Sequence, residues 1–169
     1  MKKKALVIHS GGMDSSLCLK LALQKYGASA VLSISFSYGQ KHSVELECAK
    51  KICSDWNIQH EVLDLSVLQK ITENALTHHE IPIVHKENSA PNTLVVGRNG
   101  LMARLAAIYA HTLGAHEIYM GVMELEVANS GYPDCSREYM DLKEKILQKD
   151  LNDPKFRIVT PLIHMTKKE

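Results

Sequence analysis

The stretch VIHSGGMDSSLCL, at residues 7–19, joins an apolar run to a helical pattern through two glycines and three serines. Residues 4–9 contain the run ALVI, which has no polar alternation, as expected for a strand covered on both faces of a parallel sheet. Residues 14–26 follow the helical period, with Leu17, Leu21 and Ala22 on one face, and Gly27 is a typical helix stop. The stretch therefore predicts a strand, a glycine-rich turn and a helix.

The turn between this strand and this helix has the features of an anion site. Glycine lets backbone amides approach a ligand closely, and a helix that begins near Asp14 offers unpaired amides and a positive dipole end. Ser10, Ser15 and Ser16 add hydroxyl donors. The turn matches neither the Walker A loop nor GxGxxG. The alternative is that Asp14 is an ordinary N-cap, which explains Asp14 but not the serines.

The rest of the chain alternates strands with helices. We expect strands at residues 28–35, 59–63, 116–122 and 156–160, and helices at residues 41–56, 66–76, 101–114 and 137–151. This order predicts right-handed crossovers and a parallel sheet, which binds ligands at the carboxyl ends of its strands. The loops after Ile8, Ser35 and Val122 should then meet at one cleft.

A long loop and an alanine-rich helix follow one another in the middle of the chain. Residues 77–96 lack periodicity and are expected to form a long functional loop. In the helix at 101–114, Leu101, Leu105 and Ile108 are predicted core contacts, while the alanines at 103, 106, 107 and 110 should allow close packing on the sheet.

Composition narrows the class of protein. A chain of 169 residues that is 45% hydrophobic suits one well-buried core, so we expect a single domain over residues 1–169. Twenty basic and nineteen acidic side chains leave a net charge of +1, which argues against a long nucleic acid as partner. The four cysteines form no CxxC pair, and no signal peptide or membrane-spanning run is evident. These features predict a cytoplasmic protein.

The motif SGGMDSS, at residues 10–16, resembles the SGGxDS signature of the PP-loop (N-type) ATP pyrophosphatases. That resemblance implies a three-layer α/β fold with a mainly parallel sheet, the adenine nucleotide alpha hydrolase-like (Rossmann-like) fold. Three further stretches are FSYGQKH at 36–42, PNTLVVGRNGLMARLAAIYA at 91–110 and SGYPDC at 130–135. Together the four motifs resemble the 7-cyano-7-deazaguanine synthase family of queuosine biosynthesis.

This second resemblance implies an ATP-dependent ligase. The family converts 7-carboxy-7-deazaguanine and ammonia into 7-cyano-7-deazaguanine through adenylated carboxylate and amide intermediates. It implies ATP and Mg²⁺ as cofactors, a small-molecule substrate and a homodimer. The family also carries a four-cysteine zinc segment downstream of the strand equivalent to 156–162, and the sequence to Glu169 holds no residues that could replace those ligands.

Two other functions stay open at this point. One is a nucleotide-binding module without turnover, or an inactive truncated homologue lacking the zinc segment. The other is a different PP-loop enzyme such as a tRNA thiolase, which generally needs a catalytic cysteine pair and an RNA-binding surface. The cysteine spacing and the net charge do not favour a thiolase.

The resemblance assigns nucleotide binding to one continuous stretch: His9, Ser10, Gly11, Gly12, Met13, Asp14, Ser15, Ser16, Leu17, Cys18 and Leu19. Asp14 is a predicted catalytic residue that helps to hold Mg²⁺. Arg98 is the second, because its planar guanidinium suits a phosphate or carboxylate. The alternative for Arg98 is a solvated arginine, although a cation at a helix start opposes the helix dipole unless an anion is near.

The predicted substrate-binding residues come from two other loops. Asp134 can accept hydrogen bonds from the ring N–H and the exocyclic amine of a guanine-like edge, although Pro-Asp is also common turn chemistry. Tyr132 could stack on the heterocycle, and Tyr38 and Gln40 could contact substrate or nucleotide. Asn99 is either a substrate contact or a helix N-cap.

No set of metal-ligating residues is assigned. The histidines at positions 78, 79 and 85 lack a helical HExxH frame, so they are expected to mark a polar loop.

Overall fold

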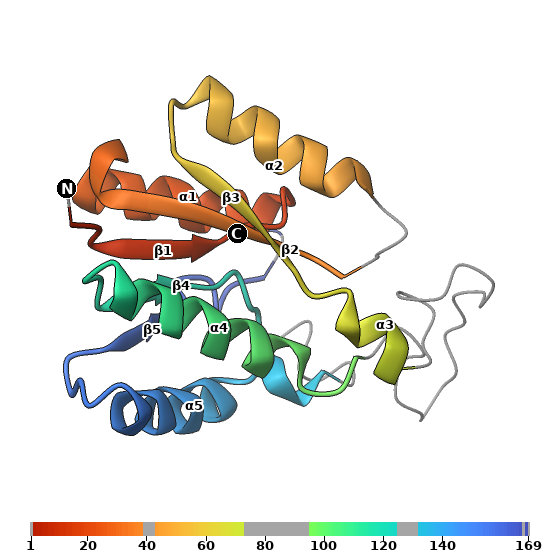
Figure 1. Cartoon of the computed structure of the whole chain (residues 1–169), viewed down its shortest axis with the longest axis vertical. Coiled ribbons are helices and arrows are strands. Elements are labelled where there is room, and N and C mark those ends of the chain that lie inside the picture. Colours follow the sequence, from red (N-terminus) through yellow and green to blue (C-terminus); the bar gives the residue numbers. More distant parts are fainter. Residues whose placement is uncertain (1, 39–42, 73–94, 125–131, 167, 169) are drawn as a thin grey trace.

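The computed structural model describes residues 2–38, 43–72, 95–124, 132–166 and 168 (Figure 1). Within these ranges one parallel sheet of five strands has the order β3-β2-β1-β4-β5. Its strands are β1 (Ala5–Ile8), β2 (Val31–Ser37), β3 (His60–Asp64), β4 (Glu117–Tyr119) and β5 (Arg157–Val159). The predicted parallel α/β sheet is confirmed.

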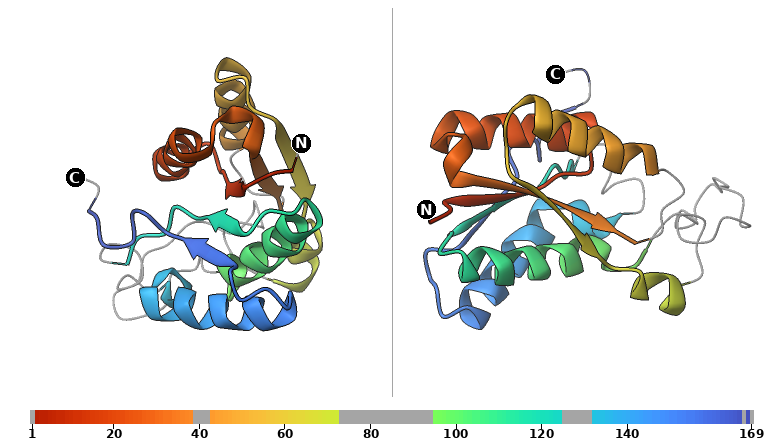
Figure 2. Two further views of the ribbon diagram at one scale, coloured as in Figure 1. Left: turned by 90° about the vertical axis from the view of Figure 1, so that its left-hand side faces the viewer. Right: turned by 45° about the horizontal axis from the view of Figure 1, so that its top comes forward.

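Helices cover both faces of this sheet. They are α1 (Met13–Tyr26), α2 (Ser43–Asp55), α3 (Val67–Ile71), α4 (Arg98–Thr112) and α5 (Arg137–Asp150), with 3-10 turns at Ala28–Ala30 and Pro133–Cys135. Figures 1 and 2 show α1 and α2 on one face and α4 and α5 on the other, which makes three layers. None of the described helices is both long and apolar enough to cross a membrane.

The central strand explains why the run ALVI has no polar alternation. Ala5 and Val7 belong to the hydrophobic core beneath α1, whereas Leu6 belongs to the core beneath α4 and α5. All three side chains are fully buried. Each face of β1 therefore needs an apolar residue.

The buried face of α1 differs from the prediction. Ser15, Cys18, Leu19 and Ala22 are buried, at the i, i+3, i+4, i+7 spacing of one helix face. Leu17, which we placed on that face, is 44% exposed. The prediction was right for Ala22 and wrong for Leu17, because the apolar periodicity of this helix is weak and does not fix its rotation about its axis.

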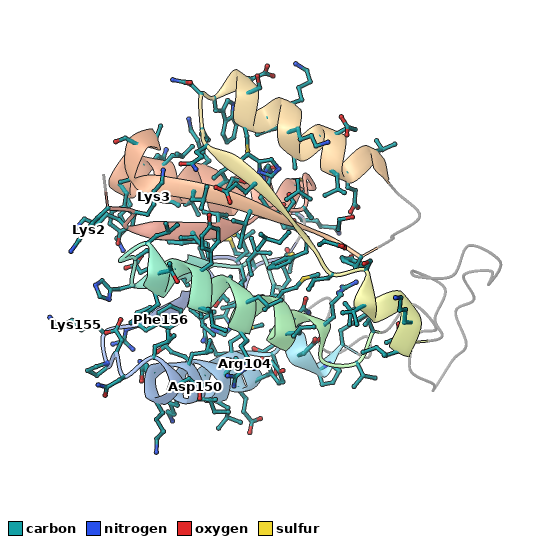
Figure 3. All side chains as sticks on the ribbon, in the orientation of Figure 1. Lys2, Lys3, Arg104, Asp150, Lys155 and Phe156 are labelled. Carbon is teal, nitrogen blue, oxygen red and sulfur yellow. The ribbon has the colours of Figure 1, made fainter. Side chains whose placement is uncertain are left out.

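Helix α4 packs through its alanines, as predicted. Ala103, Ala106, Ala107 and Ala110 are fully buried and hold the helix close to the sheet. Leu101 and Leu105 are partly buried against the core, as expected, but Ile108 is 51% exposed. Ile108 is therefore not a core residue, because it lies off the alanine stripe. Figure 3 shows the side chains between the layers.

Two glycines bring the loop after β1 into its place. Gly11 has φ of +88°, and a Cβ built there would lie 2.1 Å from the carbonyl oxygen of Glu45 in α2. A Cβ on Gly121, just after β4, would lie 3.0 Å from backbone atoms of Asp14 and Ser15. The loop is thus held between α2 and the end of β4, where only glycine fits.

Candidate functional site

A cavity of about 280 Å³ opens at the carboxyl ends of β1, β2 and β4. β1 and β4 are neighbours at the point where the strand order reverses, which is where sheets of this kind bind ligands. The described lining residues are Ile8, His9, Ser10, Gly12, Asp14, Ser15, Phe36, Tyr38, Glu45, Leu46, Arg98, Asn99, Met102, Met120, Gly121, Val122, Met123 and Cys135. The expected convergence of three loops on one cleft is confirmed.

The serine side chains at the start of α1 form hydrogen bonds with the backbone of the loop after β1. The hydroxyls of Ser15 and Ser16 donate to the carbonyl oxygen of Gly12, at 3.0 and 2.8 Å. Ser15 Oγ also accepts from the backbone N–H of Ser10 at 3.1 Å. These contacts give the loop its shape before any ligand arrives.

The N-terminus of α1 faces this cavity without a side-chain cap. Its N-cap residue is Gly12, and Asp14 is the second residue of the helix, so the N-cap alternative for Asp14 was wrong. The first amide paired within the helix is that of Ser16, which donates to Gly12 at 3.0 Å. The amides before it have the unpaired character that attracts anions at helix starts.

The predicted nucleotide-binding stretch divides into two groups. His9, Ser10, Gly12, Asp14 and Ser15 line the cavity. Gly11, Met13, Ser16, Leu17, Cys18 and Leu19 are not part of its wall: Met13 is exposed, and Cys18 and Leu19 are buried in the core. Burial, with the charge of Asp14 second, raises the pKa of the Cys18 thiol to about 12. A continuous motif thus serves both the cavity and the core.

Arg98 and Tyr38 meet at the cavity from segments 60 residues apart. Arg98 Nη1 donates to the Tyr38 hydroxyl at 3.3 Å, and the guanidinium carbon lies 5.5 Å from the ring centroid, which is a cation–π contact. No carboxylate of the described residues forms an ion pair with Arg98. The guanidinium is therefore held against an aromatic ring at the cavity wall.

The N-terminus of α4 is capped by a distant carboxylate. Its N-cap is Gly97, so the N-cap alternative for Asn99 was wrong. Asp134 Oδ2 accepts from the backbone N–H of Asn99 at 3.0 Å. A cation at the start of a helix is unfavourable beside the positive end of the dipole unless an anion is near, and the Asp134 carboxylate at this helix start is such an anion. The position of Arg98 in the first turn therefore does not by itself require a bound anion.

Asp134 has a second oxygen with no partner. Its side chain is 4% exposed, and Oδ1 is buried without a hydrogen bond from any described residue. Pro133–Cys135 does form a turn, so the turn role and an acceptor role coexist in Asp134. Asn99 Nδ2 donates to Cys135 Sγ at 3.2 Å. Burial, followed by the charge of Asp134, raises the pKa of Cys135 to about 11, so this thiol is neutral at pH 7.

The remaining predicted contacts lie elsewhere. Tyr132 packs against the hydrophobic core and is not among the lining residues, and Gln40 falls outside the described residues. The long loop at 77–96 also lies mostly outside them. Sequence reasoning missed the apolar wall made by Phe36, Met102, Met120 and Met123. For Phe36 and Met120, the signal was their position at the ends of strands.

The chain is similar to known proteins over almost its whole length. Residues 4–169 match the family model described as Queuosine biosynthesis protein QueC. A 7-cyano-7-deazaguanine synthase from Clostridium botulinum (strain 657 / Type Ba4) is 42% identical over 173 residues, covering 99% of this chain and 75% of the relative.

Solved structures with lower identity share the fold. The U34-tRNA thiolase NcsA from Methanococcus maripaludis is 18% identical with a TM-score of 0.58, covering 99% of this chain and 54% of that one. The NH3-dependent NAD synthetase from Campylobacter jejuni is 20% identical with a TM-score of 0.53, covering 92% and 66%. These neighbours confirm the predicted three-layer, adenine nucleotide alpha hydrolase-like fold. Taken with the family match and the 42% identity, they lead to one conclusion: the chain belongs to the Queuosine biosynthesis protein QueC family.

Proposed function

We propose that this protein is an ATP-dependent carbon–nitrogen ligase that converts 7-carboxy-7-deazaguanine and ammonia into 7-cyano-7-deazaguanine. One observation carries the proposal: the uncapped start of α1, Arg98 and the Asn99–Cys135 pair all line a single cavity at the strand-order reversal. The 42% identity to a 7-cyano-7-deazaguanine synthase supports the choice of reaction.

The ATP phosphates bind at the start of α1 in this proposal. The first-turn amides donate to phosphate oxygens, and the positive end of the helix dipole favours their charge. Arg98 approaches from the opposite loop, where its fork suits a phosphate or the substrate carboxylate. The apolar wall around Met102 and Met120 shields the site from water.

Asp14 fits a role as a Mg²⁺ ligand. Its partly buried carboxylate lines the cavity beside the proposed phosphate site, and Mg²⁺ is usually held by one or two carboxylates together with substrate phosphates. When bound, the ion offsets the negative charge that develops on the phosphates.

In the proposed reaction the protein positions the reacting groups and stabilises the charge that develops on them. A carboxylate is a poor electrophile, so its oxygen first attacks the α-phosphate of ATP, which releases pyrophosphate. Ammonia then displaces AMP from the mixed anhydride and gives an amide. A second ATP activates the amide oxygen, and loss of that oxygen with AMP leaves the nitrile. Holding the reacting groups in line, with fixed donors around the phosphates, lowers both barriers.

The heterocycle is recognised at Asp134 in this proposal. Among the described residues no group donates to the buried Oδ1, Asp134 directly precedes Cys135 on the cavity wall, and a guanine-like edge offers N–H donors. Oδ2 is already used by the Asn99 amide, so Asp134 provides one oxygen for the substrate.

The proposal includes the cellular setting implied by the resemblance: a cytoplasmic homodimer that acts on a small molecule and not on nucleic acid. Light scattering on the purified protein tests the dimer, and a monomeric mass at working concentration would contradict it.

Turnover tests the proposed function directly. The protein is incubated with ATP, Mg²⁺, ammonium and 7-carboxy-7-deazaguanine, and AMP and the nitrile are followed by mass spectrometry. We expect both products only when all substrates are present. Asp14→Asn should lower the rate by about 100-fold or more, because it removes the anionic ligand proposed for Mg²⁺. The matched control is Glu138→Gln, which removes an acidic residue from the first turn of α5. If the protein bound ATP but formed no product, the proposed ligase activity would be contradicted, and the protein would be a nucleotide-binding module without turnover.

A further inference from the structure

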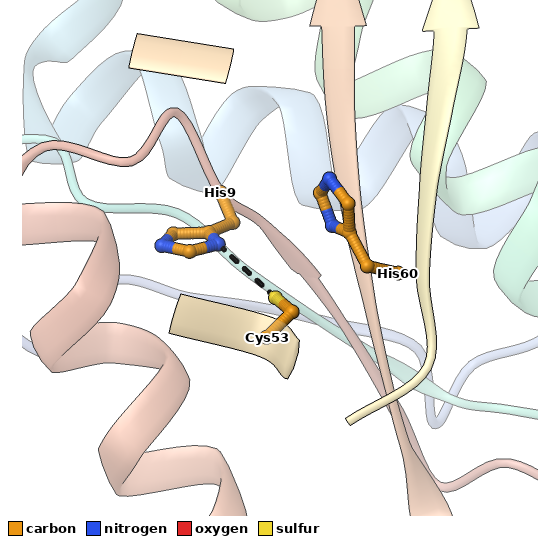
Figure 4. Close-up of side chains that lie close together, drawn as sticks. All are labelled: His9, Cys53 and His60. Carbon is orange, nitrogen blue, oxygen red and sulfur yellow. Dashed lines mark hydrogen bonds between the residues drawn. The ribbon is translucent and has the colours of Figure 1, made fainter. Parts of the chain in front are cut away.

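Three soft metal-ligating side chains meet on the α2 side of the sheet. They are His9 from the loop after β1, Cys53 from α2 and His60 from β3 (Figure 4). One ligand atom from each lies within 4.8 Å of the others. His9 and Cys53 are almost fully buried, and His60 is partly exposed at the edge strand. His9 also lines the cavity and is among the predicted nucleotide-binding residues, whereas Cys53 and His60 have no predicted role.

Hydrogen bonds assign the tautomer of His9. The Ser16 hydroxyl donates its proton to the carbonyl oxygen of Gly12 at 2.8 Å. Ser16 Oγ can therefore only accept from His9 Nε2, which lies 3.0 Å away. The proton of His9 is thus on Nε2, and Nδ1 presents a lone pair. That Nδ1 lies 3.6 Å from Cys53 Sγ and 3.3 Å from Ser33 Oγ.

His60 lies on the other side of the same serine. The Ser35 hydroxyl donates to the backbone carbonyl of His9 in a short hydrogen bond, and Ser35 Oγ also lies 3.5 Å from His60 Nε2. His60 Nδ1 lies 3.0 Å from Ser33 Oγ. The Nδ1 atoms of both rings are therefore next to one serine hydroxyl, with the Cys53 thiol beside His9.

The two rings and the thiol differ in how ready they are to bind a metal. Burial, followed by the neighbouring His60, lowers the pKa of His9 to about 4, and burial, followed by the charge of Lys50, lowers the pKa of His60, so both rings favour the neutral form that ligation requires. Burial raises the pKa of the Cys53 thiol, so an ion has to displace its proton.

We propose that His9 Nδ1, His60 Nδ1 and Cys53 Sγ bind a Zn²⁺ ion. Neutral imidazoles and one thiolate are ligands that zinc prefers, and three protein ligands leave a fourth position for the Ser33 hydroxyl or water. Tetrahedral ligands at about 2.0 and 2.3 Å from zinc are separated by about 3.6 Å. The observed Nδ1–Sγ distance is 3.6 Å.

Binding needs no redox partner. The Cys53 S–H bond breaks, its electron pair stays on sulfur and forms the S–Zn bond, and the proton leaves to solvent. The hydroxyls of Ser16 and Ser35 keep the outer ring nitrogens oriented, as second-shell groups do in known zinc sites. The ion would tie the base of the first loop to α2 and β3. It is separate from the four-cysteine segment of the family.

Zinc stoichiometry and a cobalt spectrum test this site. The purified chain is stripped with a chelator, loaded with Zn²⁺, desalted and analysed for metal. We expect the wild type to retain about one equivalent more than Cys53→Ala, the usual loading of one closed site. Co²⁺ in place of Zn²⁺ should give a thiolate-to-cobalt charge-transfer band that Cys53→Ala lacks. Zn²⁺ should raise the Tm of the wild type and not that of the variant.

The matched control is Cys48→Ala, which removes an exposed cysteine from the same helix and should behave as wild type. If Cys53→Ala does not fold, Cys53→Ser and His60→Gln replace it, because both keep the size of the side chain. Equal zinc content in wild type and these variants, or a cobalt band that survives them, would overturn the proposal.

Discussion

At the residue scale, the loop after β1 is constrained most tightly at Gly11. Its positive φ is strained for any other residue, and α2 leaves no room for a side chain. Asp134 shows a second kind of constraint, since one of its oxygens caps α4 and the other is buried with no donor in the part of the chain that the structure describes. Neither residue lines the cavity, but each holds a neighbour that does, Gly12 in one case and Asn99 in the other, and each leads to a prediction.

We expect Gly11→Ala to push the loop away from α2 and to weaken ATP binding by about 10-fold or more, with a stability loss of about 1–3 kcal/mol from backbone strain. Calorimetric titration with ATP and chemical denaturation measure the two effects. Gly27→Ala is the matched control, because Gly27 also has positive φ but a Cβ there would meet no atom within 4 Å. Equal loss of ATP binding in both variants would remove the contact with α2 from the explanation.

The variant Asp134→Asn tests the roles of the two carboxylate oxygens separately. The amide oxygen can still accept from the Asn99 N–H, while the NH₂ group faces the substrate where an acceptor stood. We expect the KM for 7-carboxy-7-deazaguanine to rise about 10-fold or more, because a buried polar pair is mismatched, and the KM for ATP to stay nearly constant.

Asp134→Ala completes this comparison. It removes the cap of α4 as well, so it should cost about 1 kcal/mol of stability beyond that of the asparagine variant. Steady-state kinetics and thermal unfolding give the readouts. If both KM values rose together in the asparagine variant, Asp134 would be structural.

At the element scale, α4 shows how a helix can be buried without large side chains. Its alanine stripe leaves no space against the sheet, while Ile108 faces away from it. The close packing of this helix on the sheet depends more on the small volume of the alanine side chains than on their hydrophobicity. The start of the same helix contributes Arg98 and Asn99 to the cavity, so its height above the sheet also positions the site.

Two substitutions in α4 test this packing. Ala107→Leu should destabilise the protein by about 1–3 kcal/mol, because the added atoms overpack a full interface. Ile108→Ala should change the free energy of unfolding by less than about 1 kcal/mol, since half of that side chain already meets solvent. Urea denaturation measures both. A larger loss for Ile108→Ala than for Ala107→Leu would contradict the observed orientation of α4.

At the scale of the whole molecule, the reversal of strand order between β1 and β4 creates the cavity, and the packing of α2 on the other side buries His9. A buried imidazole makes stability depend on pH. The pKa of His9 is lowered by burial from its usual 6.5 to about 4 in the folded protein. The unfolded chain therefore binds this proton between pH 6.5 and 4, and the folded chain does not.

Because the unfolded state gains the proton first, the free energy of unfolding should fall as pH drops from about 7 to 4, by up to about 3 kcal/mol from His9. Denaturation of the metal-free protein at several pH values measures this slope. His9→Gln removes the titrating ring and should flatten it. Parallel pH curves for the two proteins would show that His9 does not carry the effect.

Much of the fold was predictable because its signals are local. The uninterrupted run ALVI, the glycine-rich turn and the alternation of strands with helices predicted a parallel sheet and a cleft at its strand ends. The resemblance of four motifs predicted the family. The errors came from rotation about the helix axes: Leu17 was placed on the same face as the buried Ala22, and Ile108 was placed in the core. The N-cap alternatives for Asp14 and Asn99 were also wrong.

The sequence by itself determined the order of the elements, the glycine-rich turn before α1 and the family, since each depends on continuous stretches of residues. Only the tertiary structure decided that Asp134 caps α4, that Arg98 stacks on Tyr38, and that His9 meets Cys53 and His60. These partners lie far apart in the chain. Which of them meet depends on how the helices rotate and pack on the sheet, and no local pattern records that choice.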